Sequence, residues 1–435
     1  MDIVEKCSNR LKNETLIKYT GKVIKVLGVM IETQGPLVEM GEVCRIYKLR
    51  TNDYIEAEVV GFADDKVVMM PLGNMKGVAP GCKVISTNHQ LDIQVGDELL
   101  GRVLDGLGNP IDEKGKLITS EKYESFNDPP NPLVRKRINS VLPLGIKAID
   151  GMITVGKGQR IGIFAGSGVG KSTLMGMIAR NTEADVNVIA LIGERGREVR
   201  EFVEKDLGAE GLKRSVLVVA TSDKPALVRV KAALLATSIA EYFRDKGKDV
   251  ALMMDSLTRF SMAQREIGLA VGEPPVSRGY TPSVFAAMPK LLERAGNSDV
   301  GSITGLYTVL VEGDDFNEPI SDTARGILDG HIMLTRDLAA KGYYPAIDVL
   351  HSISRVMPDI VDAEHIKIVN KMKEQISIFR DSEDLINIGA YEKGTNSKID
   401  LAIEKNDIYN DFLTQLVEEK SIYEEVIEKM KEISE

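Results

Sequence analysis

One stretch decides the fold: residues 159–174 read QRIGIFAGSGVGKSTL. It opens with an apolar run, residues 160–165, continues with the glycine-rich segment 166–170, and passes through Lys171 and Ser172 into a run suited to a helix. A strand, a glycine-rich loop and a helix N-terminus in this order are the pattern of a phosphate-binding loop. The alternative is an ordinary glycine-rich turn that holds Gly-Lys-Ser by chance, and the strand before and the helix after favour the phosphate loop.

The residue types of this loop suit the phosphates of a nucleotide. Glycines let backbone N–H groups turn inward without a side chain in the way, and the following helix adds the positive end of its dipole. Lys171 is expected to reach the β- and γ-phosphates, and the Ser172 hydroxyl to ligate Mg²⁺. One residue departs from the strict pattern, because Ala165 stands where its first glycine would be. The predicted nucleotide-binding residues of the loop are Gly166, Ser167, Gly168, Val169, Gly170, Lys171, Ser172 and Thr173.

Composition argues against several classes of protein. The 435 residues suffice for about two or three domains, and 43% hydrophobic with 28% charged residues is typical of a soluble globular chain. No apolar run approaches the ~20 residues of a membrane span, and the N-terminus lacks the apolar core of a secretory signal. The three cysteines lack metal-site spacing and fit a reducing cytoplasm, and the four histidines are scattered. A net charge of −10 argues against nucleic acid as the main substrate.

Residues 19–85 predict a small antiparallel β-barrel. Short β-branched runs alternate there with turn residues at regular spacing, at 21–26, 29–32, 42–46, 54–62 and 66–70. Residues 1–18 precede the barrel as an amphipathic segment, whose apolar positions Ile3, Val4, Cys7 and Leu11 follow helical spacing. This segment either packs on its own domain or frays, or it docks on a partner, and the sequence leaves both readings open.

Residues 86–362 predict a parallel sheet flanked by helices, because apolar strands alternate with longer helical stretches. A helix over 225–246 is expected, with Ser222 or Asp223 as its N-cap and Pro225 in its first turn. The proline-rich stretch 128–132 indicates an extended surface strap. The expected strands lie at 101–110, 160–165, 186–192, 216–220, 250–254, 302–311, 331–334 and 346–350.

Residues 363–435 predict a helical C-terminal domain. Glycine becomes rare there, and segments 363–379 and 399–433 have helical patterns. The final stretch, 418–435, alternates in charge and predicts a solvated helix. The fold class is therefore α/β, with a phosphate-loop parallel-sheet core, an N-terminal small β-barrel and a C-terminal helical domain.

Further candidate site residues follow the apolar runs, since ligands of parallel sheets bind at the carboxyl ends of the strands. Asp255 ends one run and is predicted to hold the Mg²⁺ shell rather than only cap a helix. Glu194 follows another run and is the candidate to orient the attacking water, with Glu198 as a decoy and a surface charge cluster as the alternative. Arg355 is either a surface residue or the cation that neutralises the γ-phosphate in the transition state, and its spacing does not choose.

Six segments taken together resemble the ATPases of type III protein export, and the flagellar export ATPases most of all. This family is related to the head subunits of rotary ATP synthases. The resemblance covers the chain from Tyr19 to at least Pro358, and it implies a RecA-like ATPase domain over 86–362 and a homohexameric ring with ATP sites between subunits. The segments are GSGVGKST, IGERGREVREF, MMDSLTRFSMAQREIGLAVGEPP, RGYTPSVFAAMPKLLERAG, VLVEGDDFNEPISDTARGILDGHI and YYPAIDVLHSISRVMPD.

The resemblance also implies roles for single residues. Glu194 matches the catalytic carboxylate, and Arg355 matches an arginine finger supplied to the neighbouring subunit's site. The implied catalytic set is Lys171, Glu194, Arg195 and Arg355, and the implied metal set is Ser172 and Asp255.

The same resemblance adds three residues to the nucleotide site. Arg259, like Arg195, matches an arginine near the phosphates. Tyr344 matches an aromatic residue that packs on the adenine, and Phe412 would close that pocket from the C-terminal domain.

As a function, the resemblance implies Mg-ATP hydrolysis that drives chaperone release, unfolding and entry of flagellar proteins into the export gate. The implied partners are a stator-like regulator at residues 1–18, a central coiled-coil stalk protein, export-gate membrane proteins and chaperone–cargo complexes. The implied location is cytoplasmic, at the inner face of the cytoplasmic membrane, with no nucleic acid expected.

Four alternatives remain open at this stage. The first is the ATPase of a non-flagellar type III secretion system, and the second is a rotary ATPase head subunit. The third is a non-catalytic ring subunit, against which Glu194 argues. The fourth is an RNA-driven hexameric helicase, which the acidic balance disfavours.

Overall fold

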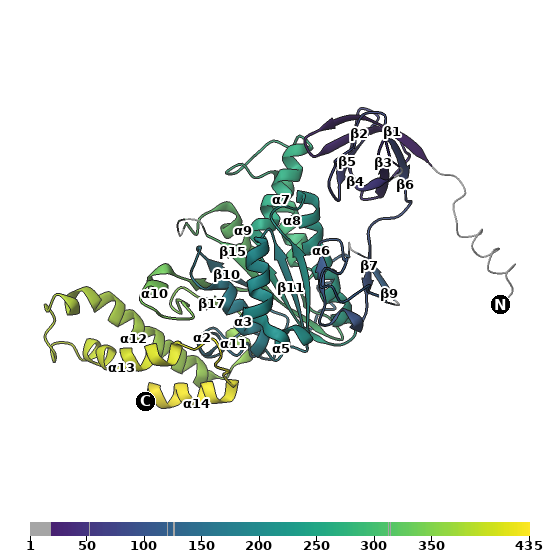
Figure 1. Ribbon diagram of the computed structural model, residues 1–435. Coiled ribbons are helices and arrows are strands. Elements are labelled where there is room, and N and C mark those ends of the chain that lie inside the picture. Colours follow the sequence, from purple (N-terminus) through teal and green to yellow (C-terminus); the bar gives the residue numbers. More distant parts are fainter. Residues whose placement is uncertain (1–18, 52, 120, 125–126, 312, 314) are drawn as a thin grey trace, which may run out of the picture.

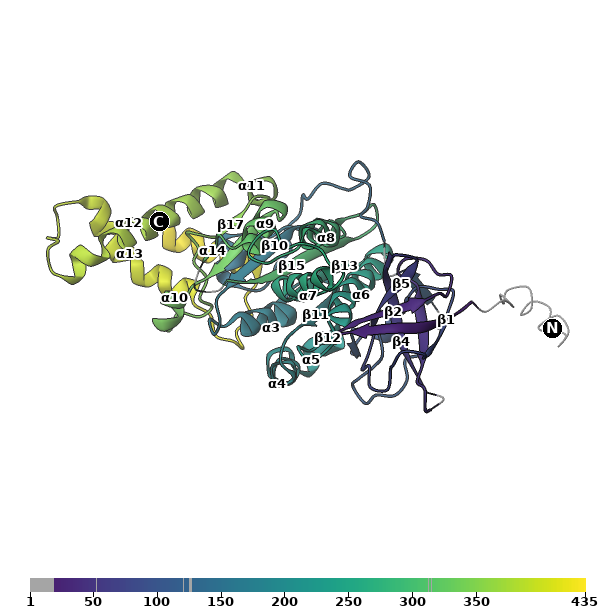
Figure 2. The same cartoon turned by 90° about the horizontal axis from the view of Figure 1, so that it is seen from above.

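The computed structural model describes residues 19–435 apart from positions 52, 120, 125–126, 312 and 314. Its three parts form a row in both views, with a barrel at one end, a sheet with helices in the middle, and further helices at the other end (Figure 1, Figure 2). The predicted fold class is confirmed. The predicted amphipathic segment 1–18 lies outside the described residues.

The N-terminal part is a closed barrel in which every neighbouring pair of strands is antiparallel. Side chains at alternate strand positions fill it, among them Val23, Ile31, Ile46 and Met69, because successive side chains of a strand point to opposite faces. Closure satisfies the backbone groups of every strand edge. In barrel order the strands are β1 (Thr20–Leu27), β2 (Met30–Gln34), β5 (Lys66–Pro71), β4 (Tyr54–Ala63), β3 (Val43–Tyr47) and β6 (Lys83–Ser86).

The middle part is built on a nine-stranded sheet that is parallel except for β14 and β17. A separate two-stranded sheet pairs β7 (Asp92–Val95) with β9 (Glu121–Glu124). The main sheet runs in the order β17 (Ile353–Ser354), β16 (Gly330–Leu334), β10 (Arg160–Ala165), β15 (Ser302–Leu310), β13 (Asp249–Asp255), β11 (Val186–Ile192), β12 (Ser215–Ala220) and β8 (Val103–Asp105), with β14 (Gly296–Asn297) beside β15.

Helices cover both faces of this sheet, because its central strands are apolar on both sides. Val188 and Ala190 of β11 are buried with α6, α7 and α8, whereas Ile189 and Leu191 are buried with α3 and η2. The helices of this part are η1 (Asp97–Leu99), α2 (Lys147–Met152), α3 (Lys171–Asn181), α4 (Gly196–Glu201), the π-helix η2 (Phe202–Leu207), α5 (Gly208–Lys213), α6 (Ala226–Asp245), α7 (Leu257–Ala270), α8 (Pro282–Leu292), α9 (Pro319–Ile327), α10 (Arg336–Ala340) and α11 (Met357–Ile360).

The C-terminal part consists of α12 (Ala363–Asn387), α13 (Ser397–Leu413) and α14 (Tyr423–Ser434). The predicted final helix is present as α14, but only one of its faces is solvated. Val426, Met430 and Ile433 of α14 are buried and pack with α2 and α12. These three residues recur at helical spacing and form an apolar stripe along one face of α14. In the sequence, the many charged residues between them make this stripe hard to recognise.

Two local predictions are wrong. Helix α6 has Pro225 at its N-cap with no side-chain cap, and Asp223 instead accepts a hydrogen bond from the Thr221 hydroxyl. The expected strand at 346–350 is reduced to one bridge between Ile347 and Leu334, because the Asp348 carboxylate turns the chain by accepting hydrogen bonds from the next backbone N–H groups.

Candidate functional site

The phosphate-binding loop sits at the carboxyl end of β10, a central strand of the sheet, and leads into α3. Gly168 and Gly170 adopt φ values of 80° and 90°, which only glycine reaches without strain. Ala165 is the last residue of β10, is buried, and pairs in register with Leu310 and Leu334. Because this position has strand geometry, it tolerates alanine where the strict motif has glycine.

Three candidate residues from separate stretches meet beside this loop. The Lys171 ammonium forms an ion pair with Oδ1 of Asp255 and lies 3.8 Å from Oε1 of Glu194. Their side chains are 12%, 5% and 15% exposed, respectively. The meeting follows from topology, because β10, β11 and β13 are close in one sheet and each ends at the same edge.

The environment of Glu194 shifts its protonation toward neutral pH. Burial, reinforced by the nearby negative charge of Asp255, raises the pKa of Glu194 to about 7. The neighbouring Glu198 accepts a hydrogen bond from Glu194, which lowers the pKa of Glu198. Glu194 is the more buried of the two, with 15% of its side chain exposed against 44% for Glu198, and it is the one that lies near Lys171.

Arg259 lies against Gly193, the residue before Glu194. Its aliphatic stem packs on Gly193, where an added Cβ would lie 2.9 Å from the Arg259 Cβ. The Nε atom of Arg259 is buried and has no hydrogen-bond partner among the described residues. A buried donor without a partner is costly, so an anion beside Glu194 would satisfy it.

The remaining loop and arginine candidates are arranged differently. Ser172 is exposed at the start of α3, so its hydroxyl is free to reach a ligand. Thr173 follows Ser172 in the first turn of α3 and is half-buried. Arg195 is 81% exposed, caps α4 and pairs with Glu198 at 3.4 Å, so it stays outside the buried cluster.

Tyr344 lies against the phosphate-binding loop. A Cβ placed on Gly170 would lie 3.5 Å from its ring, which is van der Waals contact. The Tyr344 carbonyl accepts a hydrogen bond of 2.9 Å from the backbone N–H of Gln415. The C-terminal part therefore reaches the nucleotide site through the link between α13 and α14.

Phe412 lies in the core where the C-terminal helices meet the middle part. It is 7% exposed, belongs to the core shared with α2 and α14, and lines a cavity bounded by Lys147 and those helices rather than by the loop. The adenine contact of Phe412 stays a prediction, and the backbone N–H of Gln415 is the group that meets the Tyr344 carbonyl.

Arg355 lies apart from the cluster of its own chain. It follows β17 at the edge of the sheet, is exposed, and donates hydrogen bonds to the carbonyls of Leu328 and Arg325. Because β16 separates β17 from β10, this guanidinium serves no phosphate on its own loop without a rearrangement.

Comparison with known proteins identifies the relatives of this chain. The ATP synthase alpha/beta family matches in two parts, its nucleotide-binding domain over residues 145–354 and its beta-barrel domain over residues 23–88. The C-terminal domain of the type III secretion ATPase EscN matches over residues 361–432.

Whole-chain relatives agree. The flagellum-specific ATP synthase of Bacillus subtilis (strain 168) is 57% identical over 413 residues, which is 94% of each chain. The type 3 secretion system ATPase of Xanthomonas euvesicatoria is 50% identical, over 95% of this chain and 94% of the relative. The structure of the assembled ATPase EscN from enteropathogenic E. coli superposes with a TM-score of 0.90 at 46% identity, over 95% of this chain and 100% of EscN.

The chain belongs to the ATPase family of flagellar and type III export. It is an ATP hydrolase of the ATP synthase-like type. The predicted membership of the type III export ATPases and the predicted ATP hydrolase activity are therefore confirmed.

The structure of this export ATPase adds two site residues that sequence reasoning missed. The Thr308 hydroxyl donates a hydrogen bond of 2.7 Å to Asp255 Oδ1. Nothing in the sequence of β15 distinguishes it from the other hydroxyl residues of that strand, Ser302, Thr304 and Tyr307. Gln415 joins Tyr344 as described above, and it also accepts from the Lys147 backbone N–H at 2.9 Å. No local pattern marks Gln415, since its contacts lie far away in the chain.

No group of three or more His, Cys, Asp or Glu side chains in the described part of the chain could hold a metal ion. A helix long and apolar enough to cross a membrane is likewise absent from that part.

Proposed function

We propose that this chain is the Mg-ATP-hydrolysing motor of flagellar type III protein export. It works as a homohexameric ring that uses hydrolysis to release export substrates from chaperones, to unfold them and to feed them into the export gate. The observation that carries the enzymatic core is the meeting of Lys171, Asp255 and Glu194 beside the phosphate-binding loop. The flagellar assignment is supported by the 57% identity to a flagellum-specific relative over 94% of the chain.

The residues of the site divide the work of hydrolysis. The loop N–H groups and Lys171 bind the phosphates, and Arg259 adds a cation whose Nε has no partner in the described part of the chain. Glu194 orients the attacking water and accepts its proton, a role for which a pKa of about 7 is well placed. Tyr344 packs beside the loop and covers the base end of the nucleotide.

The oxygen donors of the site fit a magnesium ion that arrives with ATP. The Asp255 contacts to Lys171 and Thr308 both use Oδ1, which leaves Oδ2 without a hydrogen bond among the described residues. Ser172 and Asp255 would hold the ion, and few protein ligands are needed because Mg²⁺ keeps waters and substrate phosphates as ligands. The ion supplies charge neutralisation at the β- and γ-phosphates.

Arg355 completes the neighbouring subunit's site rather than its own. Its exposed place at the sheet edge, away from its own loop, supports a role in trans as an arginine finger. Arg195, in contrast, is held at the surface by Glu198, so its contribution is to fix Glu198 beside Glu194.

The partners and location follow from the family. The assembled ATPase EscN has also been determined in complex with its central stalk EscO, and that structure superposes on this chain with a TM-score of 0.88 at 45% identity. By analogy, we expect a coiled-coil stalk protein in the ring centre and a stator-like regulator at residues 1–18. We further expect export-gate membrane proteins and chaperone–cargo complexes as partners, and a cytoplasmic place at the inner face of the membrane.

A deletion in the host tests this function. Cells without the chain should be bald in electron micrographs, the wild-type chain should restore flagella, and a Lys171→Ala form should restore few. Normal flagella in the deletion strain would refute the flagellar role. Loss of secreted proteins with normal flagella would instead support a non-flagellar type III secretion ATPase, which the 50% identity to the Xanthomonas relative keeps as the second candidate.

A further inference from the structure

The segment from Tyr344 to Arg355 carries the adenine-side residue at one end and the proposed finger at the other. The C-terminal part holds this segment at three points. Gln415 donates to the Tyr344 carbonyl at 2.9 Å, Arg380 of α12 donates to the Asp348 carboxylate at 3.0 and 3.3 Å, and the Lys373 ammonium donates to the Ser352 carbonyl at 3.3 Å. One stretch of chain thus connects two nucleotide-facing residues with the helical domain.

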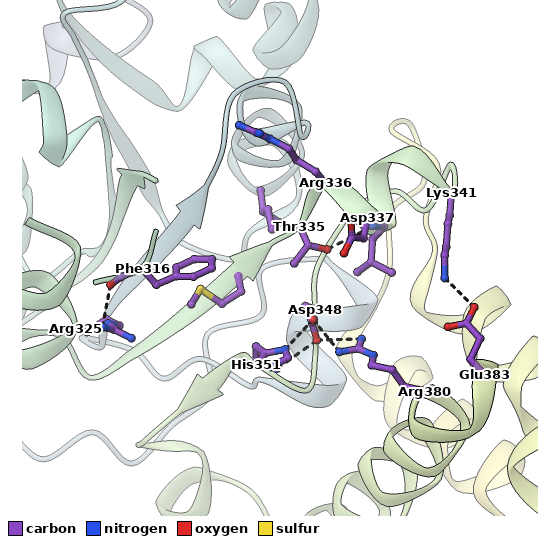
Figure 3. A pocket seen from close by; sticks show the side chains of 13 residues that line it. Phe316, Arg325, Thr335, Arg336, Asp337, Lys341, Asp348, His351, Arg380 and Glu383 are labelled. Carbon is purple, nitrogen blue, oxygen red and sulfur yellow. Dashed lines mark hydrogen bonds and ion pairs between the residues drawn. The ribbon is translucent and has the colours of Figure 1, made fainter. Parts of the chain in front are cut away.

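Asp348 is the centre of this connection. In Figure 3, its carboxylate points toward both Arg380 and His351 beside a pocket of about 600 Å³. His351 lies 2.9 Å away through Nδ1, and the backbone N–H groups of Leu350 and His351 also donate to Asp348. Burial opposes ionisation of Asp348, but the hydrogen bonds from Arg380 and His351 outweigh it and lower its pKa. The carboxylate is therefore charged at neutral pH, and it accepts a bidentate pair of hydrogen bonds from Arg380.

The same segment is fixed to the phosphate-binding loop through the sheet. The Asp348 backbone N–H donates to the Met333 carbonyl at 2.8 Å, and the Ser352 hydroxyl accepts from the Met333 N–H at 2.9 Å. Met333 belongs to β16, which pairs with β10 up to Ala165, the residue before the loop. A displacement of α12 would therefore be felt by both Tyr344 and Arg355.

We propose that Arg380 is a positioning residue for ATP turnover. Through its hydrogen bonds to Asp348, the C-terminal domain sets the position of Tyr344 over its own phosphate-binding loop and the position of Arg355 at the sheet edge. This inference rests on the roles given above to Tyr344 and Arg355. It assigns to α12 a function in hydrolysis itself, separate from any docking of partners on that domain.

The test uses full-length Arg380→Ala and Arg380→Lys, with Glu383→Ala as the matched control. Glu383 lies one turn further along α12, and it also makes an ion pair across the same junction, to Lys341 of the core at 3.0 Å. That pair does not touch residues 344–355, so Glu383→Ala breaks a cross-junction contact while sparing the connection. Arg380→Lys keeps the charge but loses the bidentate geometry, and it serves as the conservative variant if the alanine form unfolds.

Two measurements distinguish the effect of a substitution on Tyr344 from its effect on Arg355. The chain has no tryptophan, so Tyr344→Trp introduces a single fluorescent reporter beside the loop. In dilute protein, the response of this reporter to ADP measures the effect on the chain's own site. The kcat at high protein concentration measures the effect on Arg355, which acts only across a subunit contact.

In the reporter background, Arg380→Ala should raise the Kd for ADP about 5-fold or more. In the otherwise unchanged chain, it should lower kcat about 10-fold, because a small misplacement far from the chemistry is costly. Arg380→Lys should fall between, and Glu383→Ala should match the parent in both. Parent values in Arg380→Ala and Arg380→Lys, or equal losses in Glu383→Ala, would overturn the proposal. A parent chain that hydrolyses no ATP, or hydrolyses it equally well as Lys171→Ala, would instead refute the proposed enzymatic role.

Discussion

Lys171 is held by Asp255 in the place where the phosphates of ATP would bind, with Glu194 close behind. The ion pair compensates two buried charges, so binding of a phosphate would exchange one partner of the ammonium for another. Glu194 has no such full compensation, because its nearest charged neighbours include both Lys171 and Asp255. The ionisation of the Glu194 carboxyl is therefore expected to change with pH near neutrality.

Turnover should follow the ionisation of Glu194. The pKa of about 7 means that the carboxylate form, which accepts a proton from water, fills as pH rises through that value. We expect kcat/KM for ATP to rise with a midpoint near that pKa and then to level off. In Glu194→Gln, nucleotide binding should persist and turnover should be lost. Retained turnover in Glu194→Gln would remove the residue from its role.

The same shift predicts an effect on stability. A carboxyl whose folded-state pKa is raised stabilises the fold below its unfolded pKa and loses that contribution as pH rises through about 7. Glu194→Gln, which imitates the neutral acid, should therefore have a higher Tm than the wild type above that pH. Below pH 4.5, the ordinary value for this group, the two melting temperatures should coincide.

Gly193 is the second residue on which the site depends. Its φ of 70° and the Arg259 stem packed 2.9 Å from its missing Cβ leave no room for a side chain. Gly193→Ala should displace Arg259 and lower kcat/KM for ATP about 10-fold, in line with a strain of about 1–3 kcal/mol. Gly196→Ala, three residues on, is the control, because a Cβ there meets nothing within 4 Å. An equal loss in both variants would contradict the steric argument.

At the scale of elements, a buried ion pair joins α6 to the segment that follows α8. Glu241 of α6 and Arg294, just beyond α8, are 1% and 3% exposed and bond through both carboxylate oxygens at 2.8 and 2.7 Å. The Ser238 hydroxyl accepts from the same guanidinium at 2.7 Å. Both carboxylate oxygens of Glu241 accept hydrogen bonds from Arg294. The contribution of the pair to the free energy of unfolding is therefore best measured by removing one partner.

Glu241→Ala should destabilise the fold by about 3–5 kcal/mol, because a guanidinium then stays buried without its carboxylate. Denaturant unfolding followed by circular dichroism measures the change. As a control, Glu204→Ala removes the exposed pair with Arg200 on the surface and should leave the unfolding curve unchanged. A small effect of Glu241→Ala would show that water reaches the guanidinium.

At the scale of the whole molecule, a deeply buried ion pair joins the barrel to the core in addition to apolar packing. Glu58 of β4 and Lys231 of α6 are 7% and 2% exposed and lie 2.6 Å apart. Burial raises the pKa of Glu58 and lowers that of Lys231, so desolvation works against both charges. Such a pair specifies how the two parts meet more than it stabilises them.

Glu58→Ala should cost about 3–5 kcal/mol in unfolding free energy, whereas the double substitution Glu58→Leu with Lys231→Met should be nearly neutral. The same denaturant titration tests both forms. ATPase activity should survive in the double variant, since neither residue touches the nucleotide site. A double variant as unstable as the single one would mean that the charges themselves hold the barrel.

The proposed ring allows a test that no single chain provides. Lys171→Ala and Arg355→Ala should each be inactive, but mixing them should restore activity, because one chain then supplies the loop and its neighbour supplies the arginine. Random mixing in equal amounts leaves about one quarter of the interfaces with both wild-type residues. ATPase assays of the mixture against each variant alone measure the recovery. Absence of recovery in a proven ring would place Arg355 in the site of its own chain.

The sequence by itself determined the phosphate-binding loop, the barrel and the alternation of strands and helices. These features are local, since the run from Arg160 to Thr173 contains its own strand, glycine turns and helix start, and the two-residue period of the barrel strands needs no distant partner. Asp255 and Glu194 were predictable for the same reason, because each directly follows a buried strand of a parallel sheet.

Only the tertiary structure decided which side chains face the site and which do not. Arg195 turns to solvent although it adjoins Glu194, Phe412 is buried among helices, and α14 hides an apolar stripe beneath its charges. Gln415 contacts Lys147 and Tyr344, and the sequence around Gln415 has no pattern that predicts either contact. The physical reason is common to all four: their positions depend on where the C-terminal helices and the strand-end loops pack against distant parts of the chain, and packing between segments far apart leaves no periodic trace in either segment alone.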